Sequence, residues 1–496
     1  MVITGILSIF TVKTMILIFG GTAIGIILGA IPGITVTMGV ALFLPVTFGM
    51  QPIEALSLLM GLYIGGTSGG LISAILLKIP GTPASIATCF DGHPMAARGE
   101  AGKALGVGIV YSFLGGMFSL LVLFFIAPWL ANVALQFGSY EYFSIGIFSL
   151  TLVAGMSGGS LVKGLISALV GLTITFIGMA PITAFPRFTF GLSELDGGIS
   201  LLPALIGLFA VAQILEEAEA GNKDSKPIIA DYRIKGFGFS LKEFREQIGN
   251  FFRSAAIGTG IGILPGLGGA ICNVVAYGAA QKQSKYPEKF GTGIVDGIVA
   301  SETSNNASTG GALVPLMTLG IPGDNTTAII LAGFLIHGIT PGPLLFDTNG
   351  VLVYGIFAAL VVSNIFMIIT EFSGMRLFVR ILSVPKHILL PVVAILCVIG
   401  AYGLNNRVFD VWTMLFFGVL GFVMKKASIP STPLLLGFIL GPIVEIELRR
   451  GLMKSRGDFT PFFTEPISGT ILVITFIVVA FTVWGEFKKR KLKKGV

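Results

Sequence analysis

Two stretches of this sequence place small hydroxyl and amide side chains directly after an Ile-Pro-Gly triplet in apolar surroundings. The first reads IPGTPASIATCFDGHP over residues 79–94, and the second reads IPGDNTTAIILAGFLIHGITPGP over residues 321–343. Proline and glycine interrupt helices, and the broken ends present backbone N–H groups to an anion and carbonyls to a cation. Both stretches are therefore candidates for binding an anionic solute together with a cation.

The candidate substrate-binding side chains adjoin the two Ile-Pro-Gly triplets. They are Thr82, Ser85, Asn325, Thr326, Thr327 and the cationic Lys78. The alternative interpretation is helix capping, because Ser, Thr, Asp and Asn are preferred where a helix begins. Asp324 fits capping better than binding, since its charge would repel an anionic substrate.

A second polar cluster interrupts apolar sequence and forms the candidate cation-binding set. Its members are Thr67, Ser68, Ser304, Asn305 and Asn306. Polar residues inside a membrane segment are costly and indicate function by default. Their oxygens can coordinate Na⁺, and the neighbouring Glu302 can carry a charge or a proton. The alternative role is hydrogen bonding between helices.

The composition requires that these side chains be positioned by membrane helices. Of the 496 residues, 54% are hydrophobic and only 11% are charged, whereas a soluble domain carries roughly 25% charged residues. Several stretches, including 104–127, 350–370 and 467–485, are apolar over about 18 residues or more, which is enough to cross a membrane. We expect an all-α polytopic membrane protein with about 11–14 membrane segments, counting short re-entrant ones.

The apolar stretches and their interruptions define the predicted elements. Spans are expected near 12–31, 54–78, 102–127, 141–156, 160–180, 199–217, 251–280, 293–319, 350–372, 387–403, 409–424, 431–445 and 467–485. Stretches 34–49, 82–92 and 324–337 are shorter or broken and suit half-helices or re-entrant hairpins. Residues 216–250 form a polar linker whose amphipathic end suits a helix lying on the membrane surface.

The linker separates two halves that resemble each other. GIILGAIPG in the first half matches GTGIGILPG in the second, and GGLISAILLKIPG matches GGALVPLMTLGIPG. The predicted helix breaks are Gly29, Pro32, Gly33, Pro80, Gly81, Gly262, Pro265, Gly266, Pro322 and Gly323. Paired Gly/Pro interruptions at matching places indicate a transporter built from internal repeats. We expect a first repeat over 1–215, the linker over 216–250, a second and inverted repeat over 251–465, and a final span with a basic tail over 466–496.

The two signature stretches also resemble a known family. Residues 69–106, GGLISAILLKIPGTPASIATCFDGHPMAARGEAGKALG, and residues 301–346, SETSNNASTGGALVPLMTLGIPGDNTTAIILAGFLIHGITPGPLLF, are similar to signatures of the large membrane subunit of tripartite tricarboxylate transporters, the TctA family. The resemblance covers essentially the whole chain. Position 78 departs from the pattern, since it is usually uncharged and is Lys78 here, and this weakens an assignment to citrate specifically.

The resemblance implies a function and a set of partners. It implies the translocation subunit of a binding-protein-dependent secondary transporter for tricarboxylates such as citrate, driven by a Na⁺ or H⁺ gradient through alternating access. It also implies a small four-span membrane subunit and a periplasmic solute-binding protein. A carrier of another carboxylate, such as a dicarboxylate, stays open as an alternative, with a channel less favoured. A homodimer stays open as well.

The remaining motifs do not support catalysis. Two G-x-S-x-G matches, at 66–70 and 155–159, lie in glycine-rich apolar sequence, whereas a nucleophile elbow needs a strand-to-helix turn. There is no Walker A motif and no H-E-x-x-H. We expect no enzyme, no resident cofactor or metal, and no nucleic-acid partner. The basic tail EFKKRKLKKGV predicts a cytoplasmic C-terminus, and the family resemblance implies a bacterial inner membrane.

Overall fold

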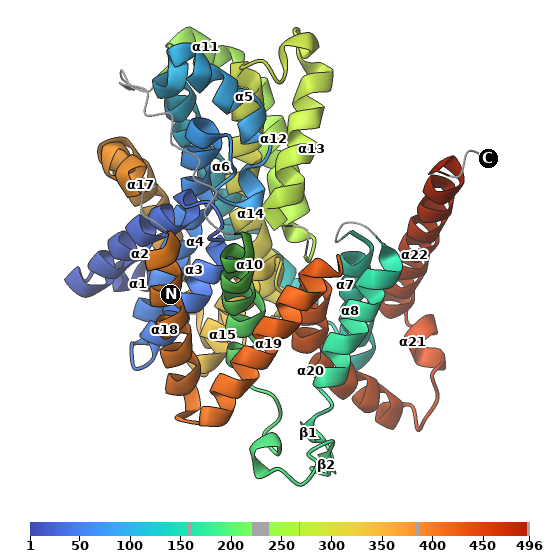
Figure 1. Ribbon diagram of the computed structural model, residues 1–496. Coiled ribbons are helices and arrows are strands. Elements are labelled where there is room, and N and C mark those ends of the chain that lie inside the picture. Colours follow the sequence, from blue (N-terminus) through green and yellow to red (C-terminus); the bar gives the residue numbers. More distant parts are fainter. Residues whose placement is uncertain (157–159, 221–237, 267, 382–385, 494–496) are drawn as a thin grey trace. The chain divides into compact units, whose positions relative to one another are not determined.

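The computed structural model describes residues 1–156, 160–220, 238–266, 268–381 and 386–493. Helices dominate the described chain, as Figure 1 shows. Its regular β-structure there is one hairpin of two-residue strands, β1 (Gly178–Met179) and β2 (Pro186–Arg187). The predicted all-α class is therefore confirmed.

Eight helical segments among the described residues are long and apolar enough to cross a membrane. They are Val12–Ala30, Pro52–Leu77, Thr88–Ala134, Leu201–Glu219, Gly350–Met375, Val408–Lys426, Ser431–Lys454 and Pro466–Trp484. Four shorter apolar helices accompany them, at Val36–Thr47, Leu161–Ile174, Asn325–Ile336 and Leu390–Gly403. The protein is a polytopic membrane protein, while the inverted repeat stays a prediction.

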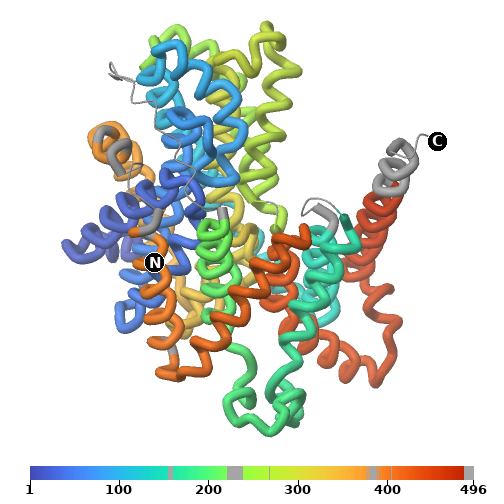
Figure 2. Tube along the Cα trace, viewed as in Figure 1, coloured from blue at the N-terminus to red at the C-terminus, as the bar shows by residue number. Residues whose placement is uncertain are grey.

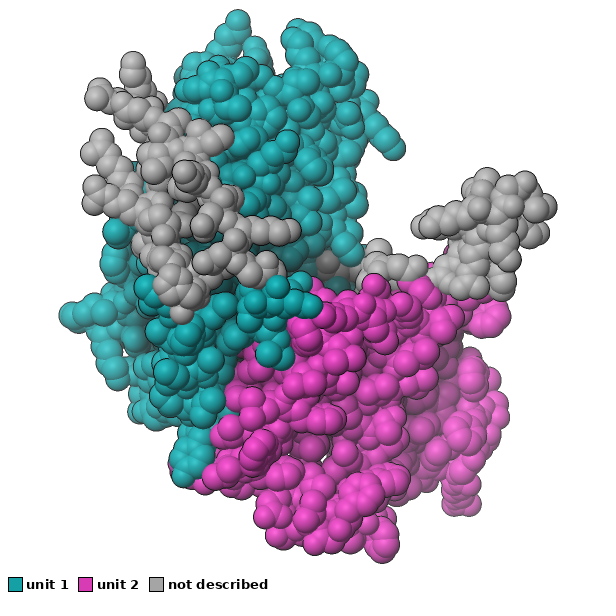
Figure 3. All heavy atoms as spheres, viewed as in Figure 1, with its two compact units in different colours: residues 1–131, 213–404 teal, residues 132–212, 405–496 magenta. Residues whose placement is uncertain are grey.

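The chain divides into two compact units, and each unit takes one segment from each predicted repeat. Unit 1 comprises Met1–Ala131 and Gln213–Leu404, and unit 2 comprises Asn132–Ala212 and Asn405–Val496. Figure 3 colours the two units separately. The signature stretches 69–106 and 301–346 both belong to unit 1. The candidate site is therefore described within that unit.

The first chain segment of unit 1 carries the first signature. Its helical elements are α1 (Val2–Ser8), α2 (Val12–Ala30), α3 (Val36–Phe43), η1 (Leu44–Thr47), α4 (Pro52–Leu77), η2 (Pro83–Ser85), α5 (Thr88–Met95), η3 (Ala96–Glu100) and α6 (Ala101–Ala134). Local sequence explains several of their boundaries. The Thr11 side chain accepts the Thr14 N–H at the start of α2, and α4 begins with a capping box formed by Gln51 and Glu54.

The second chain segment of unit 1 carries the second signature. Its helical elements are α10 (Ala212–Ala220), α11 (Leu241–Glu246), α12 (Ile248–Ile263), α13 (Gly268–Gln283), η6 (Pro287–Lys289), α14 (Val295–Leu319), α15 (Asn325–Ile336), α16 (Leu345–Thr348), α17 (Gly350–Ile381) and α18 (Lys386–Asn405). In Figure 2 the first signature lies in the blue part of the trace and the second signature in the yellow part.

The GxxxG patterns allow close helix contacts within each half. A Cβ placed on Gly25 of α2 would lie 2.6 Å from the Leu62 carbonyl oxygen and 2.8 Å from the Gly66 nitrogen of α4. In the second half, α12 packs on α14, and a Cβ on Gly262 would lie 2.6 Å from the Ser308 carbonyl oxygen. Only glycine permits backbones to approach this closely.

Two predicted segments of unit 1 differ from the structure. The expected span 251–280 is two helices, α12 and α13, because Pro265 offers no N–H and Gly266 adopts a φ of +78°. Stretch 82–92 was expected as a half-helix, but α5 continues through η3 into α6, with a kink at Gly99, where φ is +84°. The half-helix expected within 34–49 is present as α3 and η1.

Unit 2 is helical apart from the β1–β2 hairpin. Its elements are α7 (Ser139–Met156), α8 (Leu161–Ile174), η4 (Ser193–Leu195), α9 (Leu201–Leu205), η5 (Ile206–Val211), α19 (Val408–Lys426), α20 (Ser431–Lys454), α21 (Thr460–Thr464) and α22 (Pro466–Lys493). Helix α20 packs on α7 and α8, and α19 packs on η5 and α9. The expected span 160–180 is shorter than predicted, because α8 ends at Ile174 and the chain enters the hairpin.

The structure describes one of the two G-x-S-x-G matches completely, so the expectation that it is not a nucleophile elbow can be examined there. Residues 66–70 lie in the interior of α4, a continuous helix whose side chains there are buried, so Ser68 does not sit on a strand-to-helix turn. The other match, at 155–159, includes residues 157–159, which lie outside the described residues.

Candidate site at the two helix breaks

Both Ile-Pro-Gly triplets follow a helix that ends in the left-handed conformation. Helix α4 ends at Lys78, with a φ of +58°, and α14 ends at Gly320, with a φ of +71°. The two triplets therefore begin in the same way, because a left-handed residue terminates an α-helix and redirects the chain. Pro80, Gly81, Pro322 and Gly323 lie where helical structure is interrupted, whereas Gly29 and Gly262, also predicted as breaks, lie inside α2 and α12.

After the first triplet, Thr82 and Ser85 are buried together. Their side-chain oxygens lie 3.3 Å apart, so the two hydroxyls share a hydrogen bond. They pack over Gly70 of α4, where an added Cβ would lie 2.9 Å from the Thr82 hydroxyl oxygen. Gly70 thus makes the space that the hydroxyl pair occupies.

After the second triplet, the polar side chains take different roles. Asp324 caps α15, since its Oδ1 accepts the Thr327 N–H at 2.7 Å while the Thr327 hydroxyl accepts the Asp324 N–H at 2.9 Å. The expected capping role of Asp324 is present, and Thr327 is engaged in the same cap. Thr326 shares a hydrogen bond of 2.9 Å with Thr37 of α3. Asn325 differs, because its Oδ1 is buried without a hydrogen-bond partner.

Each break contacts the opposite half of the sequence. The segment η2 after the first break packs on α13 and α14, and its neighbour Ala87 donates its N–H to the Asn273 side chain at 2.9 Å. Helix α15 after the second break packs on α3 and α4, where the Tyr63 hydroxyl donates to Asp324 Oδ2 at 2.7 Å. Each break is thus held in place by side chains from the opposite half of the sequence.

The start of α13 lies between the two breaks. Gly266 donates its N–H to the Gly323 carbonyl at 2.7 Å, which joins the Pro265-Gly266 break directly to the second triplet. A Cβ on Gly269 would lie 2.9 Å from both the Ala84 Cβ and Asn305 Oδ1. A Cβ on Gly268 would lie 3.2 Å from the Asp324 Cβ. Glycines at these positions let the two breaks approach one another.

The predicted cation-binding set is buried where α4 meets α14. The Asn305 side chain donates an N–H to the Thr67 carbonyl at 3.2 Å, which joins the two halves. The Oδ1 atoms of Asn305 and Asn306 are buried and have no hydrogen-bond partner. The Ser304 hydroxyl instead donates to the Ala300 carbonyl of its own helix at 2.8 Å. Among the described residues, no group of three or more His, Cys, Asp and Glu side chains could hold a metal ion.

Two buried carboxyl groups flank this junction. Glu302 of α14 accepts hydrogen bonds from the hydroxyls of Thr88 and Ser112, the latter at 3.0 Å. Glu371 of α17 accepts one from Ser68 at 3.0 Å. Sequence analysis identified Glu302 but missed Glu371, because the predicted span ended at 372 whereas α17 continues to Ile381. The signal available in the sequence was that Glu371 is a single acidic residue at the end of an apolar run.

Lys78 lines a pocket beside the first break. The pocket has a volume of about 450 Å³ and is lined by Lys78, Pro80, Ile86, Cys89, Phe90, Pro94, Tyr277 and Gly291. Both halves contribute to it, since Tyr277 belongs to α13. Lys78 supplies positive charge, and Phe90 and Tyr277 pack edge to face at 5.3 Å between ring centroids. Such a pocket suits a small organic anion with an apolar part.

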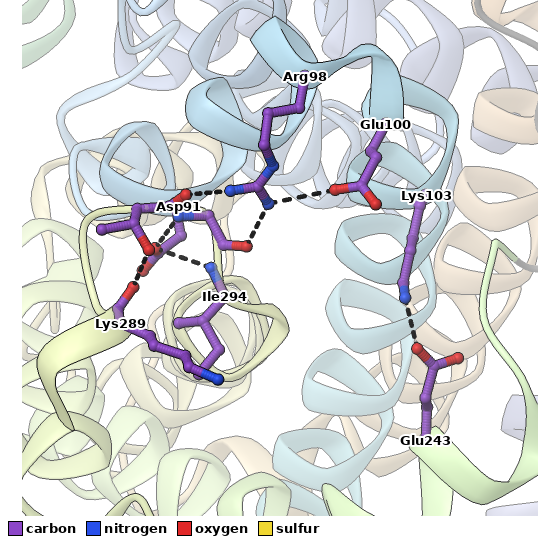
Figure 4. Close-up of polar contacts among 9 residues, drawn as sticks. Asp91, Arg98, Glu100, Lys103, Glu243, Lys289 and Ile294 are labelled. Carbon is purple, nitrogen blue, oxygen red and sulfur yellow. Dashed lines mark hydrogen bonds and ion pairs between the residues drawn. The ribbon is translucent and has the colours of Figure 1, made fainter. Parts of the chain in front are cut away.

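Asp91 fixes one wall of the pocket and was also missed by sequence analysis. Its Oδ1 accepts the N–H groups of Gly291, Gly293 and Ile294 at 2.7–3.0 Å. Its Oδ2 accepts the Tyr277 hydroxyl at 2.8 Å. Figure 4 shows Asp91 against this loop, with Arg98 bound to backbone carbonyls of the same loop. These contacts tie the first signature to the start of α14.

The end of the polar linker is anchored to α6. The location of the amphipathic run on the membrane surface stays a prediction. Its Phe239 and Phe244 pack on Tyr111 of α6, with centroids 5.9 Å from the Tyr111 ring. The Glu243 carboxylate pairs with Lys103, as Figure 4 shows. The hydrogen bond from Lys103 lowers the pKa of Glu243 to about 2, with a further contribution from the Ser240 N–H. Residues 221–237 of the linker lie outside the described residues.

Comparisons with known proteins give one consistent relationship. The model of the tripartite tricarboxylate transporter TctA family matches residues 15–436. An uncharacterized 52.8 kDa protein in the TAR-I ttuC' 3' region of Agrobacterium vitis is 35% identical over 475 residues, which cover 96% of this chain and 94% of that protein. An uncharacterized protein in the TAR-II ttuC' 3' region of the same organism is 36% identical over 234 residues, covering 47% of this chain and 97% of that protein. No solved structure matches this chain.

Proposed function

Because this chain belongs to the tripartite tricarboxylate transporter TctA family, a family of transporter membrane subunits that act with other subunits, we propose that it is the translocation subunit of a binding-protein-dependent secondary transporter. It carries tricarboxylates such as citrate across a bacterial inner membrane, with a cation moving in symport. Its partners are a small four-span membrane subunit and a periplasmic solute-binding protein, and its C-terminal tail is cytoplasmic.

The observation that carries this proposal is that each of the two helix breaks packs on the opposite half of the sequence. Thr37 and Tyr63 of the first half hold the start of α15, while Asn273 of the second half holds the chain after η2. A transporter that alternates access needs a site shared by two parts that can move against each other. In this arrangement, a substrate bound at both breaks contacts both halves of the sequence.

Substrate binding is assigned to the side chains beside the breaks that can still pair with a carboxylate or donate a hydrogen bond to it. Lys78 lines the pocket and can pair with a carboxylate, and the buried Asn325 Oδ1 lacks a hydrogen-bond partner. Thr82 and Ser85 hold hydroxyls that can donate to a carboxylate. Thr326 and Thr327 support the site through their bonds to Thr37 and Asp324.

The cation-binding role falls to the junction of α4 and α14. Thr67, Ser68, Ser304, Asn305 and Asn306 lie there, buried, beside Glu302. Oxygen atoms in a dry environment bind Na⁺ or a proton when their own hydrogen bonds are incomplete. Coupling follows if cation and substrate stabilise each other's binding by about 1–3 kcal/mol, the usual range for linked sites.

A second candidate function is transport of a smaller carboxylate. Of the described residues that line the pocket, Lys78 is the one cation. One ammonium group neutralises one carboxylate, whereas a tricarboxylate would bring two further charges. A dicarboxylate or a monocarboxylate with an apolar part matches this pocket well.

The testing experiment is uptake of radiolabelled citrate into proteoliposomes that contain the chain and its small membrane partner. The binding protein is added outside, with an inward Na⁺ gradient, an inward proton gradient or neither. Uptake that requires a gradient and the binding protein supports the proposal. Uptake of a dicarboxylate but not citrate under the same gradient supports the second candidate. Flux that is indifferent to both requirements contradicts a coupled carrier.

A further inference from the structure

Two carboxyl groups are buried beside the junction of α4 and α14 in unit 1, and the proposed binding roles leave one of them unexplained. Glu302 of α14 and Glu371 of α17 are both fully buried, with exposed fractions of 0%. Removing a carboxylate from water is costly unless hydrogen bonds or a counter-charge compensate. No described Lys, Arg or His side chain forms an ion pair with either group.

Glu302 has hydrogen-bond donors on both of its oxygens. The Thr88 hydroxyl donates to Oε1, and the Ser112 hydroxyl donates to Oε2 at 3.0 Å. The donors come from two neighbouring helices, α5 and α6, so they converge on the carboxyl from two sides. Two hydroxyl donors stabilise a negative charge in a dry environment.

Glu371 has much weaker support for a charge. Its Oε2 accepts one hydrogen bond, from Ser68 at 3.0 Å, and its Oε1 is buried without a partner. A lone carboxylate in this setting is unfavourable, and a neutral carboxyl is the more stable form. The two acids thus lie in unequal environments. The surroundings of Glu302 favour a charged carboxylate, and those of Glu371 favour a protonated carboxyl.

The other titratable groups whose side chains the structure describes around α17 do not offer Glu371 a counter-charge. Elements packed against α17 carry Lys13 on α2, Glu54 and Tyr63 on α4, and Asp347 on α16. Lys13 pairs with Glu54 at 2.7 Å, and Tyr63 donates to Asp324. Arg376 and Arg380 follow on α17 itself, outside the described side chains. Glu302 of α14, the second buried carboxyl, could add only repulsion and not a counter-charge.

The position of Glu371 connects it to both halves of the site. Its partner Ser68 directly follows Thr67, whose carbonyl accepts the Asn305 side chain at 3.2 Å. Asn305 in turn lies one helical turn after Glu302 on α14. A change of charge at Glu371 therefore acts on the contact by which the two halves meet.

We propose that Glu371 binds and releases the coupling proton, with Ser68 and Asn305 relaying its state to the junction of α4 and α14 and Glu302 remaining charged. This inference rests on the proposed function and specifies its cation as a proton. In each cycle the Glu371 carboxyl takes a proton from one side of the membrane and returns it as a proton on the other. No bond other than O–H is made or broken.

The first test measures the proton itself and needs no transport. Infrared spectra of the full chain in lipid membranes at neutral pH are compared between wild type, Glu371→Gln and Glu465→Gln, an exposed control. We expect a protonated carboxyl band that shifts in D₂O, persists in Glu465→Gln and disappears in Glu371→Gln. A spectrum that Glu371→Gln leaves unchanged would overturn the proposal, whether or not the chain transports carboxylates.

The second test distinguishes proton coupling from substrate translocation, in proteoliposomes with both partners present. Glutamine mimics the protonated acid but cannot release a proton. In Glu371→Gln, uptake driven by an inward proton gradient should fall by about tenfold or more, within the usual range of a coupling effect. Exchange of external label for internal unlabelled substrate should continue.

The outcomes of this test are distinct. Gradient-driven uptake at the wild-type level in Glu371→Gln, or accumulation driven by Na⁺ alone at constant pH, would overturn proton coupling. Wild-type protein that carries no carboxylate would refute the proposed function, while the infrared result would still decide whether Glu371 holds a proton. Loss of both uptake and exchange in a correctly melting Glu371→Gln protein would also overturn the assignment, because a pure coupling residue spares exchange.

Discussion

Lys78 and Gly320 end helices α4 and α14 in the same left-handed conformation, with φ values of +58° and +71°. Glycine adopts this conformation freely, whereas a residue with a Cβ loses about 1–2 kcal/mol. The first half therefore places an unfavourable residue where the second half has a favourable one. Lys78 is exposed and lies at the edge of a pocket, and its backbone conformation is unfavourable. A function of its ammonium group therefore explains the presence of lysine at this position better than its backbone does.

Replacing Lys78 by asparagine tests that explanation, because asparagine tolerates the left-handed conformation and lacks the charge. We expect the KM for the carboxylate to rise by about 10–100-fold, corresponding to a lost charge-assisted hydrogen bond of about 1.5–3 kcal/mol. The melting temperature should stay unchanged or rise. Lys78→Arg is the matched control and should keep most of the affinity. A wild-type KM in Lys78→Asn would exclude a role in binding the solute.

The pair Asn325→Ala and Thr327→Ala separates binding from capping after the second break. Asn325 Oδ1 has no partner to lose, so its removal should lower uptake strongly with little change in stability. Thr327 belongs to the cap of α15, and its removal should destabilise the protein by about 1 kcal/mol. Uptake and thermal melting of both variants provide the measurement. Normal uptake in Asn325→Ala would leave that side chain without a functional role.

The close contact of α2 and α4 predicts opposite effects for two glycines of the same helix. A Cβ on Gly25 would meet the α4 backbone, so Gly25→Ala should destabilise the protein by about 1–3 kcal/mol. A Cβ on Gly20 would meet nothing within 4 Å, and Gly20→Ala should be neutral or stabilising by up to about 1 kcal/mol. Thermal melting in detergent would check both. Equal effects would contradict the packing of α2 on α4.

Acidification should release α11 from α6. The pKa of Glu243 is lowered from 4.5 to about 2 in the folded protein, so its stabilising contribution is complete above pH 4.5 and is lost as the pH falls toward 2. The contribution is about 0.5 kcal/mol, because solvent screens a pair whose side chains are about one-third exposed.

A spin label at the exposed Leu241 would report this release as increased motion between those pH values. Lys103→Met is the matched control, since it removes the partner and should make the label equally mobile at neutral pH. A label that stays immobile in Lys103→Met would show that the aromatic contacts with Tyr111 alone hold α11.

Local chemistry explains what could be predicted from the sequence. Proline lacks a donor and glycine permits positive φ wherever they occur, so the breaks at Pro32-Gly33, Pro265-Gly266 and the two Ile-Pro-Gly triplets were predictable from residue type. The same holds for the Asp324 cap, which needs only a helix that begins after it. Apolar length identified the membrane helices, because a bilayer requires a fixed span.

The sequence by itself determined where the helices break and which polar side chains lie near the breaks. The tertiary structure alone decided which of them meet. Thr67 and Asn305 are 238 residues apart, and Tyr63 and Asp324 are 261 apart. Ser68 and Glu371 are 303 apart, and no motif marks Glu371. Such pairs form when helices from distant segments pack through glycine-lined contacts, and that packing depends on the whole fold and not on any local pattern.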